Sequence, residues 1–176
     1  MWAFRSYHCA HSNQRALVKF DVSNNMLLAQ GARMLADALD GNQVMKELNI
    51  SRNHFGCKDT GGQVTTNMSG VIRMADTIWR MGALSKLDIS DNSINADGAK
   101  VLAKVLKRDW LFCKDGRPFK SRGLLASPTC KHCGQKKTAH TSAAFSSLDL
   151  SHNYIPVKEM DPIKRICASK NIALSC

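Results

Sequence analysis

The chain has 176 residues, of which 44% are hydrophobic, and its formal net charge is +11. This length is typical of one domain with a continuous core. No run of about 18 or more apolar residues is present, so we expect no transmembrane helix. The first residues, MWAFRSYHCAHSN, contain no uninterrupted apolar stretch and predict no signal peptide. Seven cysteines without regular spacing argue against a disulfide framework and indicate a reducing, cytoplasmic environment.

Residues 1–15 precede the first repeating unit of the chain. The apolar side chains of Trp2, Phe4 and Tyr7 predict a cap over the exposed edge of the first strand. The alternative is the remnant of a truncated upstream repeat.

From residue 16 onward, one pattern of strand, turn and helix recurs along the chain. In its clearest copy, residues 87–89 alternate as in a strand with one buried face. Asn92 follows where its side chain can satisfy backbone groups at a turn. Gly98 then opens a segment whose apolar residues have helical spacing. The equivalent asparagines end the tetrads VSNN, ISRN, ISDN and LSHN: Asn25, Asn53, Asn92 and Asn153. Four copies in register predict stacked units that bury one continuous core.

The intervals between these asparagines are 28, 39 and 61 residues, so the second and third units contain extra residues. The extra residues of the second unit lie in GCKDTGGQVTTNMSG, which we interpret as a loop ahead of a helix over residues 71–78. The extra residues of the third form an insertion over residues 107–144. An insertion of this length without secondary structure is unusual in a compact domain, so we expect something to hold it.

Two segments, LVKFDVSNNMLLAQGARMLADAL and LSKLDISDNSINADGAKVLAKVL, follow the pattern LxxLxLxxNxLxxxGAxxLAxxL. This pattern resembles the leucine-rich repeat, of the subtype found in ribonuclease inhibitor and in NOD-like receptors. The resemblance implies an α/β fold, a short right-handed solenoid with parallel strands on its concave face and helices on its convex face. It covers three repeats over residues 16–106 and a fourth repeat with a C-terminal cap over residues 145–176. Repeat 2 departs from the pattern after Phe55, and repeat 4 has Pro156 and Pro162 where a Gly-Ala helix start is expected.

The insertion has the residues for a metal site. Its candidate ligands have the spacing C-x16-C-x2-C-x6-H: Cys113, Cys130, Cys133 and His140. Two thiolates two residues apart can face one ion, and a closed Cys3His tetrahedron is typical of one structural zinc ion. Such an ion would supply folding free energy that the few apolar residues of the insertion cannot. The alternatives are His132 in place of His140, a redox-active CxxC, and a loop without metal.

The excess positive charge lies in the same insertion. Nine lysines and arginines oppose only Asp109 and Asp115 between residues 107 and 140, which is 9 − 2 = +7. These cations predict either a solvated loop or a site for an anionic partner, such as nucleic acid phosphate or an acidic protein face. The candidate anion-binding residues are Lys114, Arg117, Lys120, Arg122, Lys131, Lys136 and Lys137. Trp110, Phe112 and Phe119 can stack on unpaired bases or form a small core around the metal.

The sequence has no phosphate loop, GxSxG elbow or HExxH helix, so we predict no enzyme and no small-molecule substrate. One equivalent strand position carries polar residues in every repeat: Asp21, Asn49, Asp88 and Asp149. We expect them to form a ladder on the exposed strand face, either as its ordinary polar surface or as a partner-binding stripe. The sequence therefore predicts an intracellular module that binds a protein partner and no membrane. An RNA- or DNA-associating protein that binds through the basic insertion is the alternative.

Overall fold

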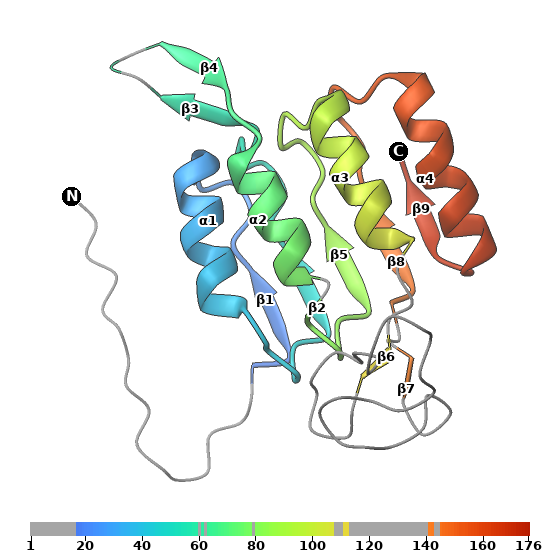
Figure 1. The fold of residues 1–176 in the computed structure, drawn as a ribbon. Helices are drawn as coiled ribbons and strands as arrows, with labels where there is room; N and C mark the ends of the chain where they lie inside the picture. Colours follow the sequence, from blue (N-terminus) through green and yellow to red (C-terminus); the bar gives the residue numbers. More distant parts are fainter. Residues whose placement is uncertain are drawn as a thin grey trace, which may run out of the picture.

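The computed structural model describes residues 17–59, 61, 63–78, 80–107, 111–112, 141–142 and 145–176. Its main sheet has five parallel strands, and their spatial order follows the chain (Figure 1). These strands are β1 (Lys19–Asp21), β2 (Glu47–Asn49), β5 (Lys86–Asp88), β8 (Ser147–Asp149) and β9 (Ala173–Ser175).

The four helices of the described residues lie side by side on one face of this sheet (Figure 1). They are α1 (Leu28–Leu39), α2 (Ser69–Ile78), α3 (Ala96–Leu106) and α4 (Val157–Ser169). Contacts between helices join α1 to α2, α2 to α3 and α3 to α4, so each strand–helix unit packs against its neighbours in the chain. The predicted α/β class and the parallel strand order are therefore confirmed.

The core lies between the sheet and the helices. The central residue of each inner strand points into it, and Leu48, Leu87 and Leu148 are 3% exposed or less. The residues on either side of these leucines point to the opposite face, as the twofold periodicity of a strand requires. Removing such side chains from water is the main favourable contribution to folding.

The four repeated asparagines form a ladder at the carboxyl ends of the strands. The backbone N–H of Asn25 donates to Asn53 Oδ1, that of Asn53 to Asn92 Oδ1, and that of Asn92 to Asn153 Oδ1, at 3.0, 3.2 and 3.0 Å. Each side-chain amide also donates to carbonyl groups, as Asn92 does to Ile50 O at 2.9 Å and Ser90 O at 3.0 Å. The predicted structural role of these asparagines at the turns is confirmed.

Repeat 2 differs from the prediction. The segment interpreted as a loop contains an antiparallel hairpin of β3 (Cys57–Asp59) and β4 (Val64–Thr66), in which Lys58 pairs with Thr65. The β-branched residues after position 63 favour a strand, and Gly61 at φ 69° adopts the left-handed conformation between the two strands. The loop prediction was therefore wrong for residues 57–66, whereas the helix that follows was right.

Helix starts differ in detail from the expected Gly-Ala signal. Helix α3 begins two residues before Gly98, because the side chain of Asn95 accepts hydrogen bonds from the N–H groups of Asp97 and Gly98 at 2.9 and 3.2 Å. Helix α4 begins directly after Pro156 and contains Pro162. A different start thus still produces the helix of repeat 4.

The two ends of the insertion meet. Strand β6 (Leu111–Phe112) pairs with β7 (Thr141–Ser142) in an antiparallel ladder, with Leu111 opposite Ser142 and Phe112 opposite Thr141. The predicted zinc ligands and the predicted anion-binding residues lie outside the described residues. The whole N-terminal segment of residues 1–15, predicted as a cap or a truncated repeat, also lies outside them.

Candidate partner-binding surface

The face of the sheet opposite the helices carries two rows of side chains. The row at the carboxyl ends of the strands consists of the predicted residues, which are register partners of one another: Asp21, Asn49, Asp88 and Asp149. The row at the amino ends of the strands consists of Lys19, Glu47, Lys86 and Ser147. Together with the backbone between them, the two rows line an open groove of about 470 Å³. We call this surface the strand-face groove.

In the carboxyl-end row, Asp21 is exposed and the other three residues are half-buried, and the row has a local structural role. Asp88 Oδ1 accepts from the N–H of Ser90 at 3.0 Å and from its hydroxyl at 2.7 Å. Asp149 makes the same two bonds to Ser151, at 2.9 and 2.7 Å. The amide oxygen of Asn49 makes the equivalent bonds to Ser51, at 3.1 and 2.8 Å. These bonds stabilise the chain as it leaves each strand.

We did not predict this local role from the sequence. The signal was present, because a serine stands two residues after Asp21, Asn49, Asp88 and Asp149 alike. An acidic or amide side chain two residues before a serine N–H is a common turn arrangement.

The side-chain interactions of the carboxyl-end row differ between its β1–β2 end and its β5–β8 end. At β1 and β2, the Asn49 amide donates to Asp21 Oδ2 at 2.9 Å. The pKa of Asp21 is lowered, first by the backbone N–H of Ser23, then by the hydroxyl of Ser23 and by Asn49. At β5 and β8, Asp88 and Asp149 are direct neighbours, and strands in a sheet lie about 4.8 Å apart. Like charges opposite one another are unfavourable, and neither carboxylate takes part in an ion pair within the described part of the chain.

The amino-end row is an ion-pair network that our sequence analysis missed. Glu47 lies between two lysines, with its carboxylate oxygens 2.9 Å from Lys19 Nζ and 3.5 Å from Lys86 Nζ. The hydrogen bond from Lys19 is the main cause that lowers the pKa of Glu47, and the charges of both lysines act in the same direction. The same repeat spacing could have identified this row, since each member stands two residues before one of the predicted residues.

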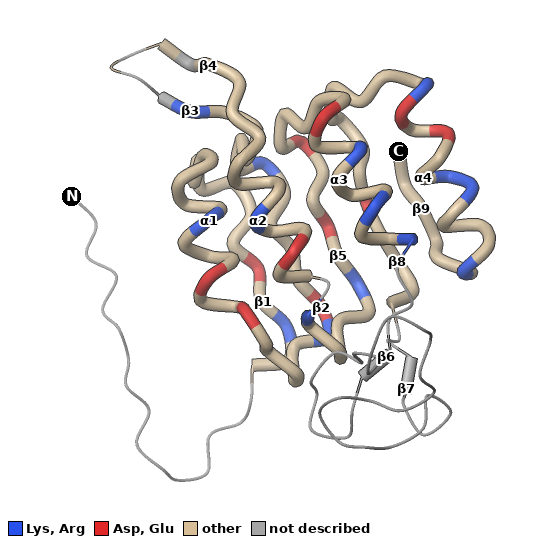
Figure 2. The backbone as a smooth tube through the Cα atoms, in the orientation of Figure 1, with Lys and Arg blue, Asp and Glu red and all other residues tan. Residues whose placement is uncertain are grey.

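Charge is therefore separated along the strands. Figure 2 shows basic residues at the amino ends and acidic residues at the carboxyl ends of β1 and β5. Lys19 and Glu47 neutralise one another, whereas Asp88 and Asp149 have no described cation beside them. The groove thus offers its strongest uncompensated charge at the carboxyl ends of β5 and β8.

Within the ranges that the structure describes, no group of three or more His, Cys, Asp or Glu side chains could hold a metal ion. The expected ligands Cys113, Cys130, Cys133 and His140 lie outside those ranges, so the zinc prediction stays a prediction.

Comparison with known families identifies the repeating unit. The family model of the leucine-rich repeat matches residues 41–62, which include β2, and residues 84–103, which include β5 and most of α3. These two segments of the chain are therefore similar to the leucine-rich repeat. Domains built from such repeats are generally protein-interaction modules and are typically not catalytic. In the part of the chain that is described, each helix is too short or too polar to span a lipid bilayer.

Proposed function

We propose that this protein is a non-catalytic, intracellular binding module that holds a protein partner in the strand-face groove. The observation that carries the proposal is the row Asp21, Asn49, Asp88 and Asp149, which four strands present side by side on the face opposite the helices. A rigid sheet orders these side chains before a partner arrives, which lowers the entropic cost of binding. Uncompensated carboxylates at β5 and β8 favour a partner that brings cationic groups.

The proposal includes the finer class of the repeat. One parallel strand and one helix per unit, with 28 residues between Asn25 and Asn53, support a short solenoid of the ribonuclease-inhibitor-like subtype. In a solenoid of this kind each repeat contacts only the repeats next to it, and the stack presents an extended surface for binding.

A steric block tests the groove directly. Ser147 is half-buried within the groove, so Ser147→Trp should fill it without a change in the core. Lys104→Trp is the matched control, because Lys104 is exposed on α3 on the helix side. We expect at least one protein, retained from a nuclease-treated cell extract by the wild type and the control, to be lost with Ser147→Trp. Retention of the same proteins by all three forms would contradict the proposal.

A charge variant tests the chemistry of recognition. Asp88→Asn with Asp149→Asn removes two charges and keeps the turn, because Asn49 makes the equivalent bonds to its serine. The control Asp76→Asn removes an exposed carboxylate on α2. The double variant should dissociate faster from the isolated partner in surface plasmon resonance, and the difference should shrink at high salt. Equal dissociation rates for the wild type and the double variant would rule out a cationic partner group at this site.

We also propose that one zinc ion holds the basic insertion through Cys113, Cys130, Cys133 and His140. The support is the pairing of Phe112 with Thr141. Cys113 follows Phe112 in the chain and His140 precedes Thr141, so two of the four proposed ligands are sequence neighbours of this strand pair. Three thiolates and an imidazole suit zinc, which would serve as a structural clip.

Elemental analysis tests the clip. We expect one zinc per chain in the wild type and none in Cys130→Ser with Cys133→Ser, together with faster proteolysis between residues 113 and 140. Zinc at equal content in both proteins, or in neither, would refute the ligand assignment. If proteins are retained only from an extract without nuclease treatment, and the chain binds oligonucleotides with a steep salt dependence, the nucleic acid alternative is favoured instead.

A further inference from the structure

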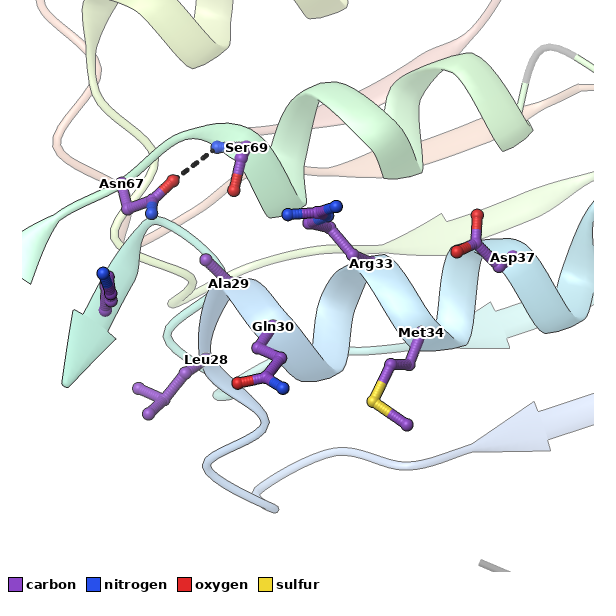
Figure 3. A pocket seen from close by; sticks show the side chains of 9 residues that line it. Leu28, Ala29, Gln30, Arg33, Met34, Asp37, Asn67 and Ser69 are labelled. Atoms are coloured by element: carbon purple, nitrogen blue, oxygen red, sulfur yellow. Dashed lines mark hydrogen bonds between the residues drawn. The ribbon is translucent and has the colours of Figure 1, made fainter.

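A second cavity lies on the helix side of the sheet, between α1, the β3–β4 hairpin and the start of α2 (Figure 3). Its volume is about 440 Å³. Its lining residues are Leu28, Ala29, Gln30, Arg33, Met34, Asp37, Lys58, Asn67 and Ser69. We call it the α1–hairpin cleft. Because it is on the face opposite the strand-face groove, it is independent of the proposed function.

This cleft exists because repeat 2 departs from the repeat pattern. Asn53 and Asn92 are 39 residues apart, against 28 for Asn25 and Asn53, and the extra residues form the hairpin that contacts α1. Insertions in repeat proteins commonly build binding surfaces.

Backbone hydrogen bonds fix the base of the hairpin, so the cleft is formed before any ligand binds. The N–H of Gly56 donates to Asn92 O at 2.9 Å, and the N–H of Asn67 donates to Gly56 O at 2.7 Å. Only glycine fits at position 56, since a Cβ there would lie 2.2 Å from Ser93 O. Ligand sites in proteins are usually preformed cavities of roughly 300–1,000 Å³.

The acidic side chain of the cleft is paired with a cation, whereas its two basic side chains are not paired with a carboxylate of the described residues. Asp37 already forms an ion pair outside the cleft lining, because its Oδ1 lies 2.6 Å from Arg73 Nε. Among the ion pairs of the described residues, neither Arg33 nor Lys58 takes part. Figure 3 shows the Arg33 side chain reaching from α1 toward the start of α2, where Asn67 and Ser69 lie. The cleft therefore holds two cations that form no ion pair within the described part of the chain, and its one carboxylate, Asp37, is paired with Arg73.

The remaining walls are partly apolar. Leu28 and Ala29 line one end, and Met34, which is 56% exposed, lines another part. Methionine adapts its shape to irregular apolar ligands. An apolar wall beside two cations matches a molecule with an anionic head and an apolar body.

We propose that the α1–hairpin cleft binds a small amphiphilic anion, a carboxylate or phosphate group carried on a short apolar body. Arg33 and Lys58 contact the anionic group, and Leu28 and Met34 contact the apolar body. The guanidinium can donate two hydrogen bonds to one carboxylate or phosphate, which makes Arg33 the stronger of the two contacts.

Displacement of a fluorescent probe from the full chain tests this site. The probe is 1-anilinonaphthalene-8-sulfonate, an aromatic anion, and the competitors are octanoate, octyl phosphate and octylammonium. We expect saturable binding, displacement by both anions, and no displacement by the cation of equal chain length. The tighter of the two anions identifies the natural headgroup.

Variants place the binding in this cleft. Arg33→Gln and Lys58→Gln should each weaken octanoate binding about tenfold, the effect of losing one hydrogen bond to a charged group. Arg33→Lys should retain part of the affinity. Lys100→Gln is the control, because Lys100 is exposed on α3 and pairs with Asp97 at 3.2 Å. All three side chains, Arg33, Lys58 and Lys100, are exposed, and thermal unfolding midpoints verify that each variant is folded.

The proposal fails if the probe shows no saturable binding. It also fails if octylammonium displaces the probe as well as octanoate does. Affinities that are unchanged in Arg33→Gln and Lys58→Gln would place the probe elsewhere and overturn the assignment.

Discussion

At the scale of single residues, the asparagine ladder explains how short strands are tied together. Asn92 is fully buried and serves four backbone groups, two as donor and two as acceptor. Three of the four, Ile50 O and the N–H groups of Asn53 and Phe55, belong to the preceding repeat. Since buried polar groups are costly when left without partners, a single asparagine stabilises two repeats at once.

Replacement of Asn92 should be among the most destabilising changes. Asn92→Ala leaves several buried backbone groups without partners, and we expect a loss of about 3 kcal/mol in the free energy of unfolding. Asn25 is the matched control, because its exposed amide donates only to Val22 O and Ser23 O within its own turn. Asn25→Ala should cost about 1 kcal/mol. Urea unfolding measures both, and equal losses would contradict the ladder as the source of the difference.

Glu47 should make stability depend on pH. Lys19 holds the pKa of Glu47 below its ordinary value of 4.5. A lowered pKa in the folded state means that this stabilisation is complete above pH 4.5 and is lost as the pH falls through the lowered folded value. Glu47→Gln should therefore flatten the decline of the urea midpoint below this pH. If Glu47→Gln and the control Asp76→Asn show the same decline as the wild type, the ion-pair network contributes nothing.

At the scale of elements, the close packing of α1 against α2 depends on a small side chain. Gly70, at the start of α2, is buried against Ala29 and Ala32 of α1. A Cβ at position 70 would lie 2.8 Å from Ala29 Cα and Ala29 O. Both are backbone atoms, so they cannot move away as a flexible side chain can. This contact fixes the spacing of the two helices beside the cleft.

The sign of the change in unfolding free energy caused by Gly70→Ala tests the close packing of α1 against α2. At an open helix position, alanine stabilises relative to glycine by about 1 kcal/mol. At position 70 we expect destabilisation of about 2 kcal/mol instead, because the added methyl group forces the helices apart. Thermal or urea unfolding gives the sign. A stabilised variant would mean that α1 and α2 are not in the close contact described.

At the scale of the whole molecule, strand order follows chain order. Strand β5 has a partner on each side, whereas β1 and β9 each have one partner within the described residues. Stacked repeats lend stability mainly to their neighbours. Stability should therefore be highest in the middle of the sheet.

Hydrogen exchange followed by mass spectrometry can measure this gradient. We expect peptides that contain β2, β5 and β8 to exchange more slowly than those that contain β1 and β9, because strands with two neighbours open only in larger unfolding events. If β9 is protected as strongly as β5, a further structural element pairs with its outer edge.

The sequence by itself determined the repeating unit. The twofold alternation in the strands, the repeated asparagine and the helical spacing after it are local patterns, and they correctly predicted a repeated strand–turn–helix unit. The resemblance of that unit to the leucine-rich repeat implied the parallel strands, which the sheet confirms. They also placed Asp21, Asn49, Asp88 and Asp149 in one row, since equivalent positions of stacked repeats become register partners. Local patterns suffice here because each unit meets only its neighbours.

Only the tertiary structure decided the hairpin, the Lys19–Glu47–Lys86 network and the α1–hairpin cleft. These features depend on groups far apart in the chain. Asp37 and Arg73, for example, are separated by 36 residues. The position of the hairpin depends on Gly56 against the loop of the next repeat, which no pattern within repeat 2 encodes. The volume and charge of a cleft follow from how elements are oriented in space, and the periodicity of a sequence specifies only which face of each element is buried.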